Sequence, residues 1–175
     1  MKKVILTYGL IAGVIVAGLM DASILLVKDH GQLGMVIGYL SMLIAFSFIY
    51  VGVKKYRDNE LGGVIKYGHA FLVGLGIASI GALIYIINWE VYMYFTNYTF
   101  MEEYSKSAIE AARAKGMAAA EIAKYQAEMA PMIEAYKSPF YRMLFTSSEI
   151  LPVGLVVSLI VAGVVRMPKG RAKAV

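Results

Sequence analysis

Apolar residues gather in four long runs that are separated by polar segments. A helix needs about 20 mostly apolar residues to cross a hydrocarbon layer about 30 Å thick. Because lipid offers no partners to backbone N–H and C=O groups, such runs must bond internally as helices. The pattern predicts four transmembrane helices, at about 4–27, 33–53, 70–94 and 149–166.

The ends of the first and fourth runs decide their interpretation. The first run begins with Lys2 and Lys3, as a signal peptide does, but its apolar stretch exceeds the usual roughly 7–15 residues and no convincing cleavage site follows. We therefore expect an uncleaved helix. The fourth run has Glu149 and Pro152 at its start, and proline is tolerated in a first helical turn. We therefore begin that crossing at Glu149.

The segment between the third and fourth runs, at about 100–138, has a different pattern. Ala, Glu, Lys and Met dominate it, and all are good helix formers. Lys115 and Gly116 are typical of a helix end, and Pro131 should kink or divide the second helix. Apolar residues at helical spacing form a seam, at Ile122, Tyr125, Met129, Met132 and Tyr136. This predicts a two-helix arm.

The expected fold is therefore all-α, with one membrane domain over residues 1–175. It is an integral membrane four-helix bundle with an extracytoplasmic helical hairpin between helices three and four. The chain is 59% apolar, well above the roughly 45–50% of a soluble domain. It has no cysteine, which excludes disulfides and thiolate metal sites.

Charge predicts the orientation of the helices. By the positive-inside rule, basic loops face the cytoplasm, which places both termini on the cytoplasmic side of the membrane. The other side has Lys28 and Asp29 in a short loop and a long segment of mixed charge. Juxtamembrane cations favour membrane lipids as partners, and no basic stripe suggests nucleic acid. The basic residues of the inner side are Lys2 and Lys3, then Lys54, Lys55, Arg57 and Lys66, then Arg166, Lys169, Arg171 and Lys173.

Each predicted crossing has a row of small residues. Such rows let helix backbones approach closely in lipid, so we interpret them as packing faces. Aromatic residues where helix three leaves the membrane are interpreted as an interfacial belt rather than as a platform for a ligand; they include Trp89, Tyr94, Phe95 and Phe100. The small residues are Gly9, Gly13 and Ala17, then Gly34 and Gly38, then Gly74, Ala78 and Ala82, then Gly154, Ser158 and Ala162.

Three carboxylates lie near the outer boundary of the predicted membrane. Asp21 is a functional candidate because charge inside a membrane helix is costly; a hydrogen-bonded or hydrated structural carboxylate is the alternative. Together with Glu90 and Glu149 it could supply oxygen ligands to a cation. Against this, Glu90 lies opposite the small-residue face of its helix, and Glu149 also suits a helix N-terminus. We expect no metal and no cofactor.

The charged loop between helices two and three is interpreted mainly as a topological anchor. Its glycine pair allows a turn, and Asp58 can pair with a neighbouring cation. His69 lies at this end whereas His30 lies at the other, so the two cannot share a site. No catalytic motif is present, and we assign no catalytic residue. The candidate residues of this loop are Tyr56, Arg57, Asp58, Gly62, Gly63 and His69.

Three segments carry a resemblance to a known family. They are Gly38-Tyr39 with Met42, Tyr56-Arg57-Asp58 followed by Gly62 or Gly63, and Glu149 followed by Leu151-Pro152-Val153-Gly154. Through them the chain resembles the bacterial membrane proteins of domain-of-unknown-function family 4199, over essentially its whole length. The resemblance implies a small four-helix integral membrane protein of the bacterial inner membrane and brings no activity with it.

Three functions follow as hypotheses. The leading one is a non-enzymatic membrane component that binds a membrane protein partner or a second copy through the arm and the small-residue faces. The alternative is a small oligomeric transporter or proton-linked permease that uses Asp21 and Glu149. A membrane enzyme acting on lipid-like substrates, with Arg57, Asp58 and His69, is the least favoured.

Overall fold

The computed structural model describes residues 1–26 and 32–166. Helices account for nearly all of these residues, and no strand occurs among them, which confirms the all-α class. His30 and the cations at Lys28, Lys169, Arg171 and Lys173 lie outside the described residues. The helices are α1 (Lys2–Leu26), α2 (Gln32–Glu60), α3 (Tyr67–Phe95), α4 (Phe100–Ala114), α5 (Ala119–Tyr136) and α6 (Pro139–Val165).

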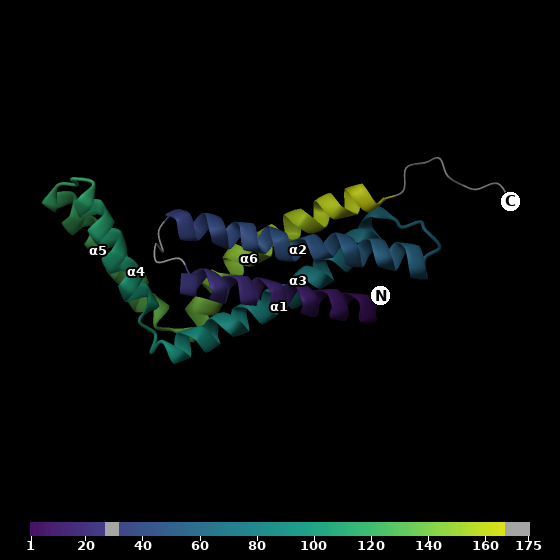
Figure 1. Cartoon of the computed structure of the whole chain (residues 1–175), viewed down its shortest axis with the longest axis horizontal. Coiled ribbons are helices and arrows are strands. Elements are labelled where there is room, and N and C mark those ends of the chain that lie inside the picture. The colour runs from purple at the N-terminus through teal and green to yellow at the C-terminus, as the bar shows by residue number, and fades with distance from the viewer. Residues whose placement is uncertain (27–31, 167–175) are drawn as a thin grey trace.

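Four of these helices, α1, α2, α3 and α6, are long and apolar enough to cross a membrane. They run alongside one another, and α4 and α5 lie beyond one end of them (Figure 1). We call α4 and α5 together the arm. The opposite end, where the N-terminus lies close to the connection between α2 and α3, is called the basic end.

The sixth helix begins ten residues before the position expected from the sequence. Ser138 has extended backbone angles and Pro139 stands in the first turn of α6, where proline suits a helix start. Pro152, which was expected near the start, lies inside α6 instead. The helix therefore extends from the base of the arm into the bundle.

The core of the bundle confirms three of the four small-residue faces. A Cβ atom at Gly9 would lie 2.6 Å from Cβ of Ile80, and one at Gly154 would lie 2.8 Å from Cβ of Ala78. These distances are shorter than real carbon contacts, so only glycine allows the helices to approach as they do. In α2 the outcome differs, because a Cβ at Gly38 would meet no atom within 4 Å.

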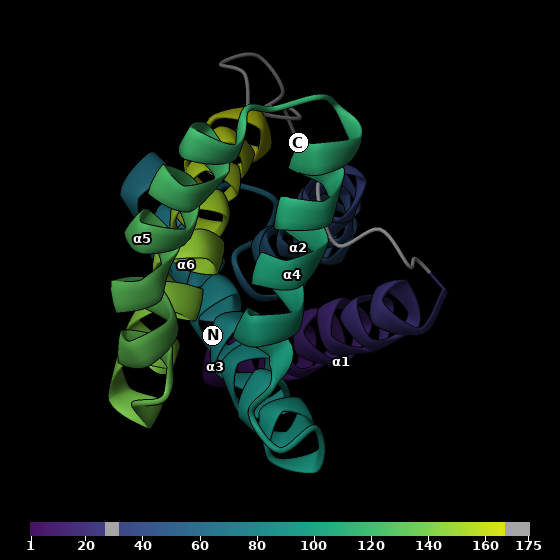
Figure 2. The ribbon, with the colours of Figure 1, turned by 90° about the vertical axis from the view of Figure 1, so that its left-hand side faces the viewer.

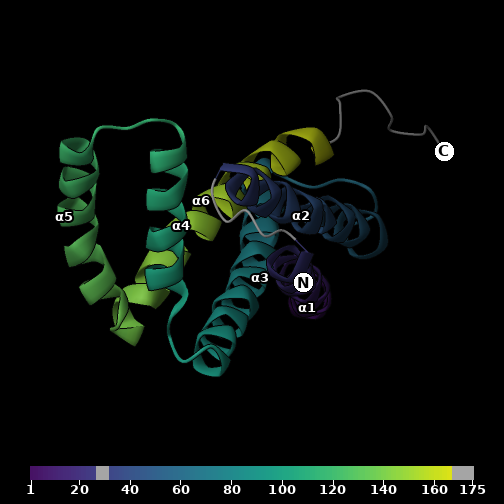
Figure 3. The same cartoon turned by 60° about the vertical axis from the view of Figure 1, so that its left-hand side comes forward.

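Part of the apolar seam of the arm is buried, against the other arm helix and against the bundle. Ile122, Met129 and Tyr136 of α5 are buried, and so are Met101 and Ile109 of α4. The two helices lie side by side in both turned views (Figures 2 and 3). The predicted end of the first arm helix is confirmed, since Lys115 caps α4 and Gly116 has φ +78°. Pro131 does not divide the second arm helix, because α5 is continuous through it.

Candidate functional site

Asp21, the first of the three candidate carboxylates, joins two helices of the bundle. Nδ2 of Asn88 on α3 donates a hydrogen bond of 2.9 Å to Oδ1 of Asp21 on α1. Both groups are partly buried. An amide partner satisfies a carboxylate without neutralising it, and the pair links the neighbouring helices α1 and α3.

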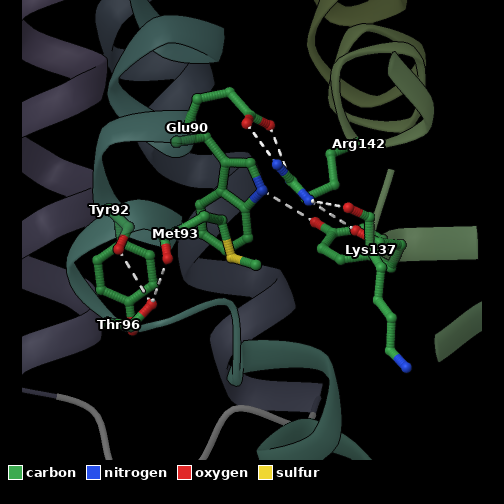
Figure 4. Close-up of polar contacts among 8 residues, drawn as sticks. Glu90, Tyr92, Met93, Thr96, Lys137 and Arg142 are labelled. Carbon is green, nitrogen blue, oxygen red and sulfur yellow. Dashed lines mark hydrogen bonds and ion pairs between the residues drawn. The ribbon is translucent and has the colours of Figure 1, made fainter. Parts of the chain in front are cut away.

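Glu90 pairs with an arginine that sequence reasoning did not single out. Nε and Nη2 of Arg142 donate to the two carboxylate oxygens of Glu90 at 2.9 and 2.7 Å. Nη1 donates to the backbone carbonyls of Tyr136 and Lys137, both at 2.9 Å, as Figure 4 shows. The bidentate geometry is the strong form of this ion pair, and it ties α3 to the junction of α5 and α6.

Trp89, next to Glu90, is part of the same junction rather than of an exposed belt. It is buried, its Nε1 donates to the hydroxyl of Tyr136 at 2.9 Å, and its ring meets that of Phe100 edge-on at 4.8 Å. Burial raises the pKa of Tyr136 to about 12, so its hydroxyl keeps its proton at neutral pH. Tyr94 and Phe95 are exposed, as a belt requires.

Glu149 on α6 lies apart from such partners. It is half-buried, and its carboxylate forms no hydrogen bond or ion pair with any of the described residues. The described part of the chain also contains no group of three or more His, Cys, Asp or Glu residues placed to hold a metal ion. The structure therefore does not bring the three carboxylates together as a cation site.

Glu149 instead lines a cavity of about 360 Å³. The cavity lies where the arm meets the bundle, and all six helices contribute to its wall. The bundle supplies Met20, Gly38, Met42, Tyr85 and Trp89, and the arm supplies Phe100, Met101, Tyr104, Met132 and Tyr136. Sequence reasoning could not predict it, because its walls come from segments far apart in the chain.

The glycines of α2 explain where this space comes from. Gly34 and Gly38 both line the cavity, and the side of Gly38 where a Cβ would stand is open. The small-residue row of α2, which we interpreted from the sequence as a packing face, therefore borders open volume instead of a neighbouring helix.

Comparison with known proteins gives a family and no activity. A family model described as "Protein of unknown function (DUF4199)" matches residues 7–167, nearly the whole chain. The chain belongs to the DUF4199 family. Neither the search of curated proteins nor the search of solved structures found a match.

Two of the segments that carry the DUF4199 resemblance contribute to the cavity. Gly38, Tyr39 and Met42 line it from α2, and Glu149 lines it from α6. Gly154, at the end of the segment that begins with Glu149, makes the close contact with Ala78 described above. The cavity wall and the helix packing beside it thus include residues from two of the three segments that carry the resemblance.

The remaining segment, Tyr56-Arg57-Asp58 with its glycine pair, forms a junction at the basic end of the DUF4199 chain. Arg57 donates from Nη1 to the carbonyl oxygen of Val165 at 2.9 Å and from Nε to Asp58 at 2.6 Å. It therefore joins the ends of α2 and α6 and satisfies a terminal carbonyl group. Gly62 and Gly63 have φ of +66° and +91°, so they provide the turn that the sequence predicts.

Other residues of the basic end also contact one another. Tyr56 is buried and its ring centroid lies 6.0 Å from that of His69. The N-terminal amino group forms an ion pair of 2.7 Å with Glu60. These contacts give Tyr56, Arg57, Asp58 and His69 neighbours within the fold at this end of the bundle.

Proposed function

We propose that this DUF4199 chain is a non-enzymatic, multi-pass protein of the bacterial inner membrane that binds a small hydrophobic ligand in the cavity between arm and bundle. The observation that carries the proposal is the cavity itself. Its volume of about 360 Å³ lies within the range of roughly 300–1,000 Å³ that is typical of ligand sites. Its wall is mainly apolar and aromatic, with few polar groups, as in such sites.

Charge supports a cytoplasmic location for both termini. Lys2 and Lys3 lie at the same end of the molecule as the connection between α2 and α3, which Lys54, Lys55 and Lys66 flank (Figure 1). The positive-inside rule then makes the basic end cytoplasmic and the arm an extracytoplasmic hairpin. Membrane lipids surround the exposed apolar faces of the four long helices.

A role in binding a protein partner has less support in the structure. Three of the five seam residues on which that hypothesis depended are buried inside the chain, against the rest of the arm and against the bundle. The small-residue faces of α1, α3 and α6 are occupied by packing inside one chain. A second copy or another membrane protein would have to bind through other surfaces.

The transporter hypothesis also loses one of its two residues. Asp21 lies outside the cavity wall and is hydrogen-bonded to Asn88, whereas Glu149 faces the cavity. A shared pathway through both carboxylates therefore has no support in this geometry, and ligand binding at Glu149 is the simpler proposal.

Trp89 allows a direct test, because it is the chain's one tryptophan and lines the cavity. In lipid nanodiscs, bromododecanol should quench Trp89 fluorescence saturably, since bromine quenches on contact. Gly38→Leu should weaken the saturable part, because the new side chain stands at the cavity wall and takes up part of the volume without meeting an atom at its Cβ.

The matched control is Gly163→Leu. Gly163 is exposed on α6, its Cβ would also meet nothing within 4 Å, and it lies outside the cavity wall. This variant should keep the saturable quenching. Quenching that is only proportional to bromododecanol in the lipid, or that is identical in both leucine variants, would overturn the proposed function.

A further inference from the structure

We infer that the cavity selects hydrophobic organic cations, with an ammonium group held by Glu149 against aromatic rings. This inference rests on the proposed function and names its ligand class. It starts from the difference between Glu149 and the other two carboxylates at this end of the bundle.

Glu149 is the carboxylate of the three that lacks a partner among the described residues. Glu90 has the guanidinium of Arg142 and Asp21 has the amide of Asn88, whereas Glu149 faces the cavity without such a group. A carboxylate removed from water is strongly disfavoured unless a cation or hydrogen-bond donors compensate it. A bound cation supplies that compensation.

The aromatic side chains of the wall favour the same ligand. Rings of six residues surround the cavity together with Phe100. The faces of Trp and Tyr rings attract ammonium groups, and aromatic walls are a known means of recognising alkylated ammonium. The six residues are Tyr39, Tyr85, Trp89, Tyr104, Tyr136 and Phe145.

The charge of the wall opposes an anionic ligand. Among the described residues that line the cavity, none is a lysine or an arginine, and Glu149 is the charged one. An anion such as a fatty acid would bring a second negative charge near Glu149, which is unfavourable in a partly desolvated site. Charge complementarity therefore favours a cation over an anion of equal length.

The methionines of the wall indicate a class of ligand rather than one molecule. Five of the 11 methionines of the chain line the cavity within the described residues. Methionine is flexible and polarizable, and it is common at surfaces that accept several shapes. The site therefore specifies a positive charge on an apolar body and tolerates variation in that body; the five are Met20, Met35, Met42, Met101 and Met132.

The test compares three bromine-labelled dodecyl probes that differ in the head group. The probes are an alcohol, a trimethylammonium and a carboxylate, each titrated against Trp89 fluorescence in nanodiscs of zwitterionic lipid. The part of the quenching that rises in proportion to probe concentration is subtracted as the contribution of probe in the lipid. We expect the ammonium to bind at least about tenfold more tightly than the alcohol, and the carboxylate more weakly than both.

Two variants assign the preference to a residue. Glu149→Gln should bring the ratio of ammonium affinity to alcohol affinity down to about one, and saturable quenching by the alcohol shows that the cavity is still present. Asp21→Asn makes the same chemical change at a carboxylate outside the cavity wall, and it should keep the ammonium preference.

The outcomes separate this inference from the proposed function. Equal binding of the three probes to the wild-type chain would overturn the inference and leave the proposed function standing. An ammonium preference that persists in Glu149→Gln would also overturn it. Absence of saturable quenching by every probe would overturn the proposed function. If Glu149→Gln does not fold, the comparison of head groups on the wild-type chain still decides the matter.

Discussion

At the scale of single residues, Arg142 shows how the arm is fixed to the bundle. Its side chain is 1% exposed, and its guanidinium bonds to Glu90 and to the carbonyls of Tyr136 and Lys137. The ring of Tyr98 lies 4.7 Å from Cζ of Arg142 and adds a cation–π contact. One side chain therefore contacts α3, the loop after it, and the end of α5.

Replacing this residue should destabilise the protein strongly. Arg142→Ala leaves Glu90 and two carbonyl groups without their donor, and breaking a buried pair in this way costs about 3–5 kcal/mol. We expect a clear fall in the midpoint of thermal unfolding of the purified protein. Arg113→Ala, at an exposed position on α4, should leave that midpoint nearly unchanged. Equal midpoints for the two variants would contradict the role of Arg142.

The sequence offered little that could single out Arg142. It lies near the start of an apolar run, where an isolated cation is typical of a membrane boundary. Its partner Glu90 is 52 positions earlier in the chain, and no local spacing connects the two. By contrast, Gly62 and Gly63 were correctly assigned to a turn, because a left-handed backbone is a local requirement.

At the scale of helices, the chain uses glycine in two opposite ways. Gly9 and Gly154 permit close helix contacts, whereas Gly38 borders a cavity. The sequence predicted the first use, since rows of small residues at helical spacing favour packing. It could not separate the second use from the first, because the difference depends on which helix, if any, lies opposite the glycine.

A pair of matched variants measures the packing role. Gly154→Ala places a Cβ 2.8 Å from that of Ala78 and 3.3 Å from the ring of Phe46. Overpacking of this kind costs roughly 1–3 kcal/mol, so the thermal midpoint in detergent should fall. Gly163→Ala adds the same methyl group where nothing lies within 4 Å and should not lower the midpoint. A stable Gly154→Ala would show that α3 and α6 can separate without loss.

At the scale of the whole molecule, the four long helices and the arm were largely predictable. A helix that crosses a membrane needs about 20 mostly apolar residues, whereas a helix outside it also has polar ones. Both patterns can be recognised in the sequence. The start of α6 was harder to predict from the sequence, because the ten residues after Pro139 mix polar and apolar side chains. The cavity was not predictable at all, because it exists only once six helices have assembled around it.

The proposed orientation can be tested with single cysteines, because the chain has none of its own. Lys106→Cys lies at an exposed position on the arm, and Lys66→Cys lies at an exposed position of the basic end. In intact cells with a permeable outer envelope, a membrane-impermeant maleimide should label the first variant. It should label the second only after the inner membrane is opened. The reverse labelling pattern would show that the arm faces the cytoplasm and would contradict the proposed orientation.

The open side of Gly38 has a cost for the fold as a whole. Glycine in the interior of a helix costs about 1 kcal/mol relative to alanine, and at Gly38 no tight helix contact offsets that cost. Gly163 has an equally open side, but Gly38 differs from it in lining the cavity. Under the proposed function, Gly38 is therefore a position where helix stability is given up to leave room for a ligand.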